Sequence, residues 1–220
     1  MVSTKLQAVR ARIADAARRA GRPSESVRLI CVTKSATLDQ IRQAVAAGAA
    51  DLGENRVQEA QPKIEAVGRA VTWHMIGTLQ RNKVKAAVGL FGWIHSVDSV
   101  ALALMLERQA AAAGRVVPVL IEVNTSGEAT KHGVPPEAVD PLLATIRPMA
   151  HVRARGLMTM APLVERPEQA RPYFRALRAL AERFRLPELS MGMSQDFEVA
   201  VEEGATMVRV GTAIFGQERV

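Results

Sequence analysis

Lys34 is the first residue in this sequence whose position points to chemistry. It directly follows the apolar or near-apolar run LICVT (29–33), which has the composition of a buried strand. Alternation along a strand places Ile30, Val32 and Lys34 on one face, so a strand would hold this lysine rigidly at its end. Partial withdrawal from water disfavours the ammonium, and the neutral amine can condense with an aldehyde to a Schiff base. An isolated lysine would more often reach out to solvent, so its neighbours decide the interpretation.

Two segments far along the chain have the composition of anion-binding loops. They are SMGMS (190–194) and VRVGT (208–212). Glycines such as Gly211 let backbone N–H groups approach an anion, and the hydroxyls of Ser194 and Thr212 add donors. Ser194 is also placed to open the helix that follows. Ordinary turn chemistry would explain either loop alone, but the two together predict a phosphate site.

Arg209, within the second of these segments, adds a positive charge to the pattern. Val208 and Val210 share one face of a strand, so Arg209 points to the opposite face. A strand centre rarely holds an arginine without a partner, and a salt bridge inside the fold is one explanation. The other is a cation that faces the ring nitrogen or the phosphate of a ligand. A Schiff-base lysine, a phosphate site and such an arginine fit pyridoxal 5′-phosphate (PLP).

The histidines and the cysteine are weaker candidates. His74 and His95 end neighbouring predicted strands and could form a metal pair, but no cysteine or carboxylate cluster completes the ligand set, so no metal site is predicted. His132 and His151 are assigned to the surface or to supporting contacts. The single cysteine, Cys31, lies within an apolar run, and we interpret it as a small buried side chain rather than a nucleophile.

The elements that must position these residues alternate along the chain. Short apolar runs typical of strands are separated by Ala-, Leu- and Arg-rich stretches of helical periodicity. Eight such units predict an α/β fold, a closed (β/α)₈ or TIM barrel formed by one domain over residues 1–220. An open doubly wound sheet is the alternative, but no G-x-G-x-x-G motif follows the first strand. Strands are predicted at 28–33, 50–53, 71–76, 91–95, 117–123, 151–157, 187–191 and 206–210, and helices at 4–20, 38–48, 55–67, 80–88, 98–113, 136–148, 167–185 and 195–203.

A barrel would bring the candidate residues together. Active sites of such barrels lie at the carboxyl ends of the strands, and phosphates commonly bind to the loops after strands seven and eight. Lys34 follows the first predicted strand, and the two glycine-containing loops follow the seventh and eighth. We therefore expect one site at that end of the barrel.

Composition excludes several classes of protein. The 220 residues have a net charge of +7, but the arginines are dispersed and no nucleic-acid-binding motif is present. No apolar run reaches the ~18 residues of a membrane span, and the Ala- and Arg-rich start lacks the apolar core of a secretory signal. One cysteine cannot form a disulfide within the chain. We expect a cytoplasmic protein.

Eight short motifs carry a resemblance to a known family that extends over residues 27–216. They are VTK (32–34), LGENRVQE (52–59), WHMIGTLQRNK (73–83), HSVD (95–98), EVNTSGEATKHG (122–133), RGLMTM (155–160), LSMGMSQDFEVAV (189–201) and GATMVRVGTAIFG (204–216). In this order and combination the chain resembles the YggS/PROSC family of pyridoxal phosphate homeostasis proteins. The resemblance implies the barrel of PLP fold type III, similar to the N-terminal domain of alanine racemase, and expected here without the C-terminal β domain.

The resemblance also implies a function and a set of cofactor-binding residues. The function is PLP binding and a part in intracellular PLP (vitamin B6) homeostasis, with no established catalytic residue or turnover. We expect a monomer that passes PLP to PLP-dependent apoenzymes and binds neither nucleic acid nor membranes. The implied residues are Lys34, which carries PLP as an internal aldimine, Ser194, Gly211 and Thr212 at the phosphate, Arg209 near the pyridine nitrogen, and Asn55 and Met191 along the cofactor.

Two other functions stay open. A PLP-dependent amino-acid racemase or lyase would need a second acid–base group at the mouth of the barrel, for example His74 or Lys131. The one tyrosine, Tyr173, falls in a predicted outer helix, which favours binding over racemase chemistry. A Schiff-base aldolase that uses no PLP would also place a lysine in a phosphate-binding barrel.

Overall fold

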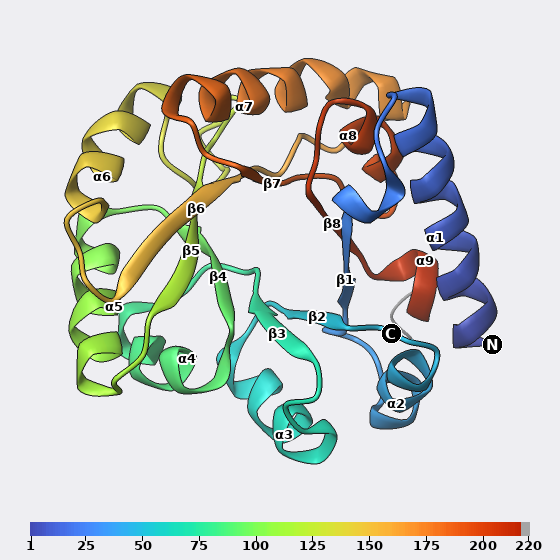
Figure 1. Ribbon diagram of the computed structural model, residues 1–220, viewed down its shortest axis with the longest axis horizontal. Helices are drawn as coiled ribbons and strands as arrows, with labels where there is room; N and C mark the ends of the chain where they lie inside the picture. Colours follow the sequence, from blue (N-terminus) through green and yellow to red (C-terminus); the bar gives the residue numbers. More distant parts are fainter. Residues whose placement is uncertain (217–220) are drawn as a thin grey trace.

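The structure, a computed structural model that describes residues 1–216, is a closed barrel of eight parallel strands with helices around it (Figure 1). The strands are hydrogen-bonded in chain order, and β8 pairs with β1 to close the ring. This arrangement confirms the predicted (β/α)₈ class over the open sheet. The strands are β1 (Arg28–Val32), β2 (Asp51–Glu54), β3 (Thr72–Met75), β4 (Trp93–Val97), β5 (Val117–Glu122), β6 (Val152–Met158), β7 (Glu188–Ser190) and β8 (Met207–Val210).

The helices follow the predicted ranges, with some shorter than expected. One helix, α9, was not predicted, because four residues are too few to show helical periodicity. The α-helices are α1 (Val2–Arg19), α2 (Leu38–Ala46), α3 (Val57–Val67), α4 (Val84–Leu90), α5 (Val100–Ala112), α6 (Val139–Ile146), α7 (Arg171–Phe184), α8 (Phe197–Glu202) and α9 (Thr212–Phe215), and the 3₁₀-helices are η1 (Ser24–Ser26), η2 (Arg81–Lys83), η3 (Pro136–Ala138) and η4 (Pro167–Ala170).

Helix α1 lies over the place where the first and last units of the barrel meet. Figure 1 shows it beside α8 and α9, at the side of the barrel that holds β1 and β8. Its buried face includes Ile13, and its polar face pairs Arg12 with Glu198 at 2.7 Å and Arg19 with Glu202 at 2.8 Å. Exposed ion pairs contribute little each, so burial of the apolar face holds the helix in place.

Alternation along the strands divides the core into two parts. Outward-facing strand residues pack against the helices in the main apolar core, where burial of each large side chain contributes about 1.5–3 kcal/mol. The inward-facing apolar cluster is small and consists of Ile30, Leu120, Met158 and Met207. The barrel interior also contains buried polar side chains, namely His74, His95, Ser190 and Arg209.

Strand β6 approaches β7 closely at one glycine. The register of β5 against β6 shifts between Val119 and Leu120, and Leu120 is then opposite Gly156. A Cβ atom on Gly156 would lie 1.9 Å from the backbone oxygen of Glu188 on β7. Only glycine allows the two strands to pair at this position.

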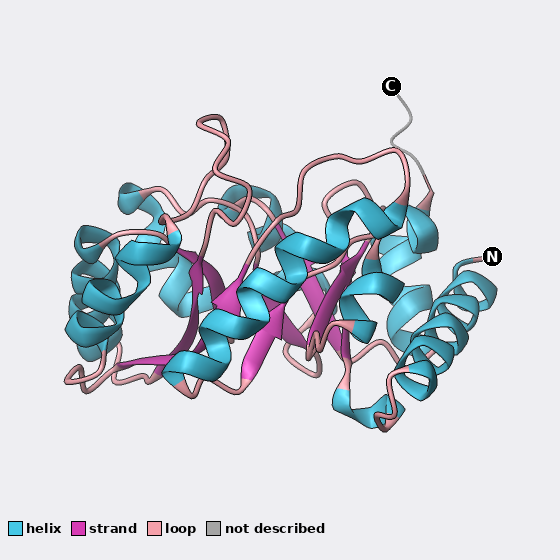
Figure 2. Ribbon diagram, turned by 90° about the horizontal axis from the view of Figure 1, so that it is seen from above, coloured by secondary structure: helices cyan, strands magenta, loops and turns pink. Residues whose placement is uncertain are grey.

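The longer loops lie at one end of the barrel, as Figure 2 shows. They follow the carboxyl ends of the strands and include residues 123–135 after β5 and 159–166 after β6. That end is where a site was predicted. None of the helices within residues 1–216 combines the length and the apolar character that crossing a bilayer requires.

Candidate functional site

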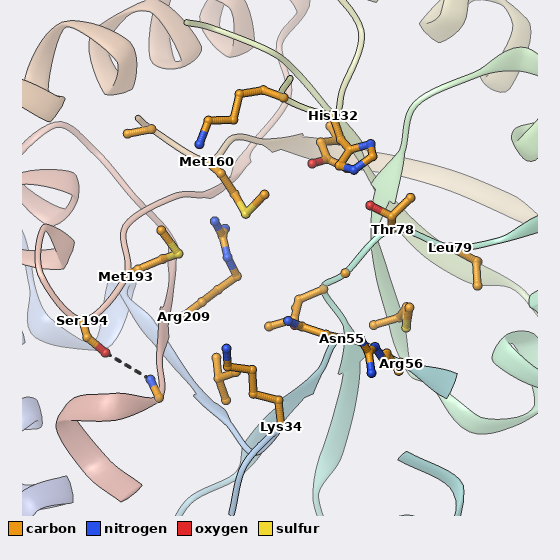
Figure 3. Close-up of a pocket in the computed structure, with 18 of the residues that line it drawn as sticks. Lys34, Asn55, Arg56, Thr78, Leu79, His132, Met160, Met193, Ser194 and Arg209 are labelled. Atoms are coloured by element: carbon orange, nitrogen blue, oxygen red, sulfur yellow. Dashed lines mark hydrogen bonds between the residues drawn. The ribbon is translucent and has the colours of Figure 1, made fainter. Parts of the chain in front are cut away.

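A cavity of about 1270 Å³ opens at the carboxyl ends of the strands (Figure 3). Its walls come from both the first and the last units of the barrel, because β1 and β8 are neighbours. All but one of the cofactor-binding residues expected from the sequence line it. Those that do are Lys34, Asn55, Ser194, Arg209, Gly211 and Thr212.

Lys34 follows β1 and is directed into the cavity in Figure 3. Ile30 lies inside the barrel and Val32 on the cavity wall, which confirms the alternation expected for this strand. Lys34 is an exposed residue, and the partial withdrawal of its amine from water stays a prediction. It is exposed because it projects from the strand end into an open cavity.

A buried charge pair supports the backbone at Lys34 from the side of the helices. Glu54, fully buried at the end of β2, accepts a hydrogen bond from the hydroxyl of Thr33 and pairs with Lys63 Nζ at 2.7 Å. Lys63 reaches in from α3 and also donates to the carbonyl oxygens of Thr33, at 2.7 Å, and Lys34, at 3.4 Å. This charge pair was not predicted from the sequence, although a carboxylate in a buried strand signals a nearby cation.

The loops after β7 and β8 are joined by Ser194. Its hydroxyl oxygen accepts hydrogen bonds from the backbone N–H groups of Gly211, at 3.3 Å, and Ala213, at 3.4 Å. The prediction that Ser194 opens the next helix is wrong, because α8 begins at Phe197 with Asp196 as its N-cap residue. Ser194 instead connects two loops that line the same wall of the cavity.

Met191 is the expected site residue that the structure does not bring to the cavity. Ser190 faces the barrel interior, so the next residue faces outward, and Met191 is fully buried in the main apolar core. Gly192, with φ of 91°, then turns the chain. As a result the side chain of Met193 lines the cavity, and Figure 3 shows it there.

Arg209 lines the floor of the cavity and is 4% exposed. Its Nη1 donates to the hydroxyl of Ser190 at 2.6 Å, and its Nη2 donates to the carbonyl oxygen of Thr159 at 2.9 Å. Burial lowers the pKa of Arg209 to about 10, while nearby Glu122 and Asp196 oppose that shift. The inward direction predicted for this side chain is confirmed, and its hydrogen-bond partners are neutral groups.

Glu122 ends β5 and is a second buried charged group of the cavity. It is 3% exposed, and its Oε2 atom has no hydrogen-bond partner. Burial raises the pKa of Glu122 to about 7, against the opposing effect of Arg209. Glu122 was not among the site residues predicted from the sequence. Its signal is a glutamate at the inward-facing end of a buried strand, which needs either a partner or a ligand.

The two histidines considered as a metal pair contact each other inside the barrel. His74 Nδ1 and His95 Nε2 are 3.0 Å apart, and their other ring nitrogens contact Asp51 at 2.8 Å and Ser190 at 3.0 Å. In the described residues 1–216 there is no group of three or more His, Cys, Asp or Glu side chains suited to a metal. Of the remaining histidines, His132 lines the cavity; His151 pairs with Glu107 at 3.0 Å.

The rest of the cavity wall is rich in positive charge. Arg56 follows β2 and pairs with Glu59 at 2.9 Å, and its neighbour Asn55 is a neutral, half-buried residue of the same wall. Lys83 and Lys131 add ammonium groups from other units of the barrel. Together with Arg209 and Lys34, these groups favour an anionic ligand.

The chain matches one family profile and several curated proteins over nearly its whole length. The profile described as alanine racemase, N-terminal domain, matches residues 4–219. A pyridoxal phosphate homeostasis protein from Aquifex aeolicus is 45% identical over 222 residues, which covers 98% of this chain and 97% of that protein. A pyridoxal phosphate homeostasis protein from Pseudomonas aeruginosa is 40% identical over 218 residues, which covers 98% of this chain and 95% of that protein.

A solved structure is similar over the same length. It is PipY of Synechococcus elongatus with PLP bound, and it is 38% identical with a TM-score of 0.86. The similarity covers 98% of this chain and all of that one. An alanine racemase from Clostridium difficile, 13% identical with a TM-score of 0.75 over 58% of its chain, shares the fold.

Proposed function

The chain belongs to the pyridoxal phosphate homeostasis protein family, and from this premise we propose that it binds PLP in the cavity, with Lys34 as the point of covalent attachment. When bound, this cofactor supplies an aldehyde that forms an imine with a primary amine. One observation carries the proposal: Lys34 after β1 and the Ser194–Gly211 connection after β7 and β8 line one cavity. The pairing of β1 with β8 makes them neighbours.

The residues present fit the chemistry of this cofactor. Ser194 Oγ accepts hydrogen bonds from two backbone N–H groups, which leaves its own hydroxyl hydrogen for a phosphate oxygen. Thr212 offers a second hydroxyl on the same wall. Arg209 would face the pyridine nitrogen, and Glu122 lines the same cavity. Asn55 would line the cofactor, and Met193 takes the place expected of Met191.

The proposed cellular role is to hold PLP and release it. Its support is the name of the relatives together with the exposure of Lys34 in an open cavity, which suits exchange. The finer parts of this proposal are that the protein works as a monomer in the cytoplasm and that PLP-dependent apoenzymes receive the cofactor. Sedimentation of the purified protein tests whether it is a monomer. An assay of apoenzyme activation tests whether PLP is passed on. The PLP-loaded protein should activate the apoenzyme faster than the same amount of free PLP does.

Reduction and peptide mapping test the attachment point. The protein with added PLP should show an absorption band near ~420 nm that borohydride removes, with the pyridoxyl mass on the peptide of Lys34. Lys34→Ala should lose the band and retain weaker, noncovalent binding through the phosphate loops. Lys83→Ala, which removes another lysine of the same cavity, should keep the band. A pyridoxyl group on Lys83 or Lys131, or an unchanged band in Lys34→Ala, would show that Lys34 is not the attachment point.

Turnover of amino acids is the second candidate function, and Glu122 is the observation in its favour. A buried carboxyl with a pKa of about 7 can both donate and accept a proton near neutral pH. Incubation of the PLP-loaded protein with a panel of L-amino acids, followed by chiral analysis and keto-acid assays, separates binding from turnover. Rates above those of free PLP that fall in Glu122→Gln would favour a racemase or lyase. Rates equal to those of free PLP would favour the binding protein.

A further inference from the structure

A row of buried polar side chains crosses the barrel beneath the cavity. It begins at Arg209, whose Nη1 lies 2.6 Å from Ser190 Oγ. Ser190 Oγ lies 3.0 Å from His95 Nδ1, and His95 Nε2 lies 3.0 Å from His74 Nδ1. The row ends at Asp51, where His74 Nε2 lies 2.8 Å from Oδ1. Four consecutive hydrogen bonds therefore connect β8, β7, β4, β3 and β2.

The two ends of this row determine the direction of every hydrogen bond in it. A guanidinium can only donate and an ionised carboxylate can only accept. When Asp51 accepts the proton on His74 Nε2, a neutral His74 must accept through Nδ1 from His95 Nε2–H. His95 Nδ1 then accepts from the hydroxyl of Ser190, whose oxygen accepts from Arg209. All four bonds run toward Asp51 if both imidazoles are neutral.

The surroundings favour neutral imidazoles. His74 and His95 are fully buried, and burial lowers the pKa of both, that of His95 to well below its ordinary value. Besides burial, His74 lowers the pKa of His95, and the charged groups that act on the two rings are Asp51 and two arginines. Arg28, with Nε 3.9 Å from Asp51 Oδ1, and Arg209 both lower the pKa of His95. Only Asp51 favours the imidazolium, and it is hydrogen-bonded to His74 alone of the two.

We propose that Ser190, His95, His74 and Asp51 form a one-way hydrogen-bond relay that fixes the orientation of Arg209 in the floor of the cavity and links its charge to Asp51 at the amino end of β2. The ligand-related part, that the relay aims Arg209 at the ring nitrogen of PLP, rests on the proposed function. The relay itself does not. Its members are positioning residues, because they reach the ligand only through Arg209.

The relay explains how a buried arginine can be rigid without a carboxylate in contact with it. Nη1 is held by Ser190 and Nη2 by the carbonyl oxygen of Thr159, so both arms of the guanidinium are fixed. Hydrogen bonds in series polarise one another, which spreads the positive charge of Arg209 toward Asp51. Arg209 itself lines the cavity, and Figure 3 shows its side chain among the other residues of the cavity wall. Held this way, a guanidinium would keep a ring nitrogen opposite it unprotonated.

NMR tests the relay without any ligand. Long-range ¹H–¹⁵N correlation spectra of the full-length protein report the tautomer of each of its four histidines. We expect His74 and His95 to be neutral with the proton on Nε2, from about pH 6 to about pH 8. A proton on Nδ1 of His95, or an imidazolium signal from His74, would overturn the one-way relay.

A pair of serine variants tests the effect on the ligand. Ser190→Ala removes one link, and Ser96→Ala makes the same change at a fully buried serine on β4 whose hydroxyl has no hydrogen-bond partner. Ser190→Ala should weaken PLP binding about tenfold and shift the absorption band of the bound cofactor, whereas Ser96→Ala should change neither. In an Arg209→Met background, Ser190→Ala should cause no further loss.

The outcomes separate the two proposals. Unchanged PLP affinity and spectrum in Ser190→Ala, or an equal loss in the Arg209→Met background, would refute the positioning role. If Ser190→Ala does not fold, the histidine tautomers of the unmodified protein still decide whether the relay exists. Failure of PLP to attach to the unmodified protein would refute the proposed function and leave the tautomers unaffected.

Discussion

Replacing Glu122 by glutamine should make the protein more stable, and more so as the pH rises. Burial raises the pKa of this carboxyl from 4.5 to about 7, so the folded protein keeps a proton that the unfolded chain has released. Between these two pH values the unfolded state binds fewer protons than the folded one, and stability falls as the pH rises. Glutamine cannot ionise, so the variant does not have this loss.

The size of the effect follows from the two pKa values. One pKa unit corresponds to about 1.4 kcal/mol, so a shift from 4.5 to about 7 amounts to about 3 kcal/mol once the pH exceeds the folded value. At about pH 5.5 roughly 1.4 kcal/mol of this cost is already present. The advantage of Glu122→Gln over the unmodified protein should therefore grow by about 2 kcal/mol between about pH 5.5 and about pH 8.5.

Urea unfolding without added PLP measures this difference, with tryptophan fluorescence as the signal. Trp73 and Trp93 lie on β3 and β4, so their fluorescence reports on the barrel. Glu137→Gln is the control, because Glu137 is an exposed residue of η3 and its replacement should give no difference that depends on pH. An advantage of Glu122→Gln that is equal at every pH, or that shrinks as the pH rises, would show that Glu122 is ionised in the folded protein and would refute the reasoning.

Three further predictions concern packing, reactivity and the phosphate loops. Gly156→Ala should lower the free energy of unfolding by more than about 3 kcal/mol, because its Cβ would collide with the backbone of Glu188. Gly89→Ala on α4, where no atom crowds the new Cβ, should raise the free energy of unfolding by about 0.5–1 kcal/mol. Equal thermal midpoints for the two variants would contradict this prediction. Cys31 is fully buried and its pKa is raised to about 12, so a thiol reagent should label it only after unfolding, and rapid labelling of the native protein would show that β1 opens. Ser194→Ala should weaken PLP binding about tenfold in a titration while the band near ~420 nm persists, and an unchanged affinity would remove Ser194 from the phosphate site.

Alternation within strands made much of the site predictable. The two-residue period of β1 placed Ile30 and Lys34 on the inner face, and that of β8 turned Arg209 inward between two outward valines. The same rule would have placed Met191 correctly, because it follows inward-facing Ser190. The expectation for Met191 came from the family resemblance instead, and the structure shows it in the main core.

Other residues were not predictable, because their roles depend on contacts between distant elements. Lys63 supports the backbone at Lys34 only because its long side chain reaches from α3 over the end of β1. The sequence placed His74 and His95 on neighbouring strands, but it could not show that Asp51 and Ser190 take their outer ring nitrogens. Glu122 lies within a predicted strand, and the lack of a hydrogen-bond partner for its Oε2 atom becomes visible only in the folded barrel.

The pairing of β1 with β8 has a consequence for the synthesis of the protein. A growing chain exposes Lys34 long before Gly211 and Thr212 are made, so the cavity cannot exist until β8 has closed the ring. This closure brings together residues from opposite ends of the chain and is entropically the most costly pairing of the barrel. A ligand that bridges β1 and the loops after β7 and β8 binds only the closed ring and stabilises it by mass action. Such a ligand would therefore favour the completed barrel over chains in which β8 has not yet paired with β1.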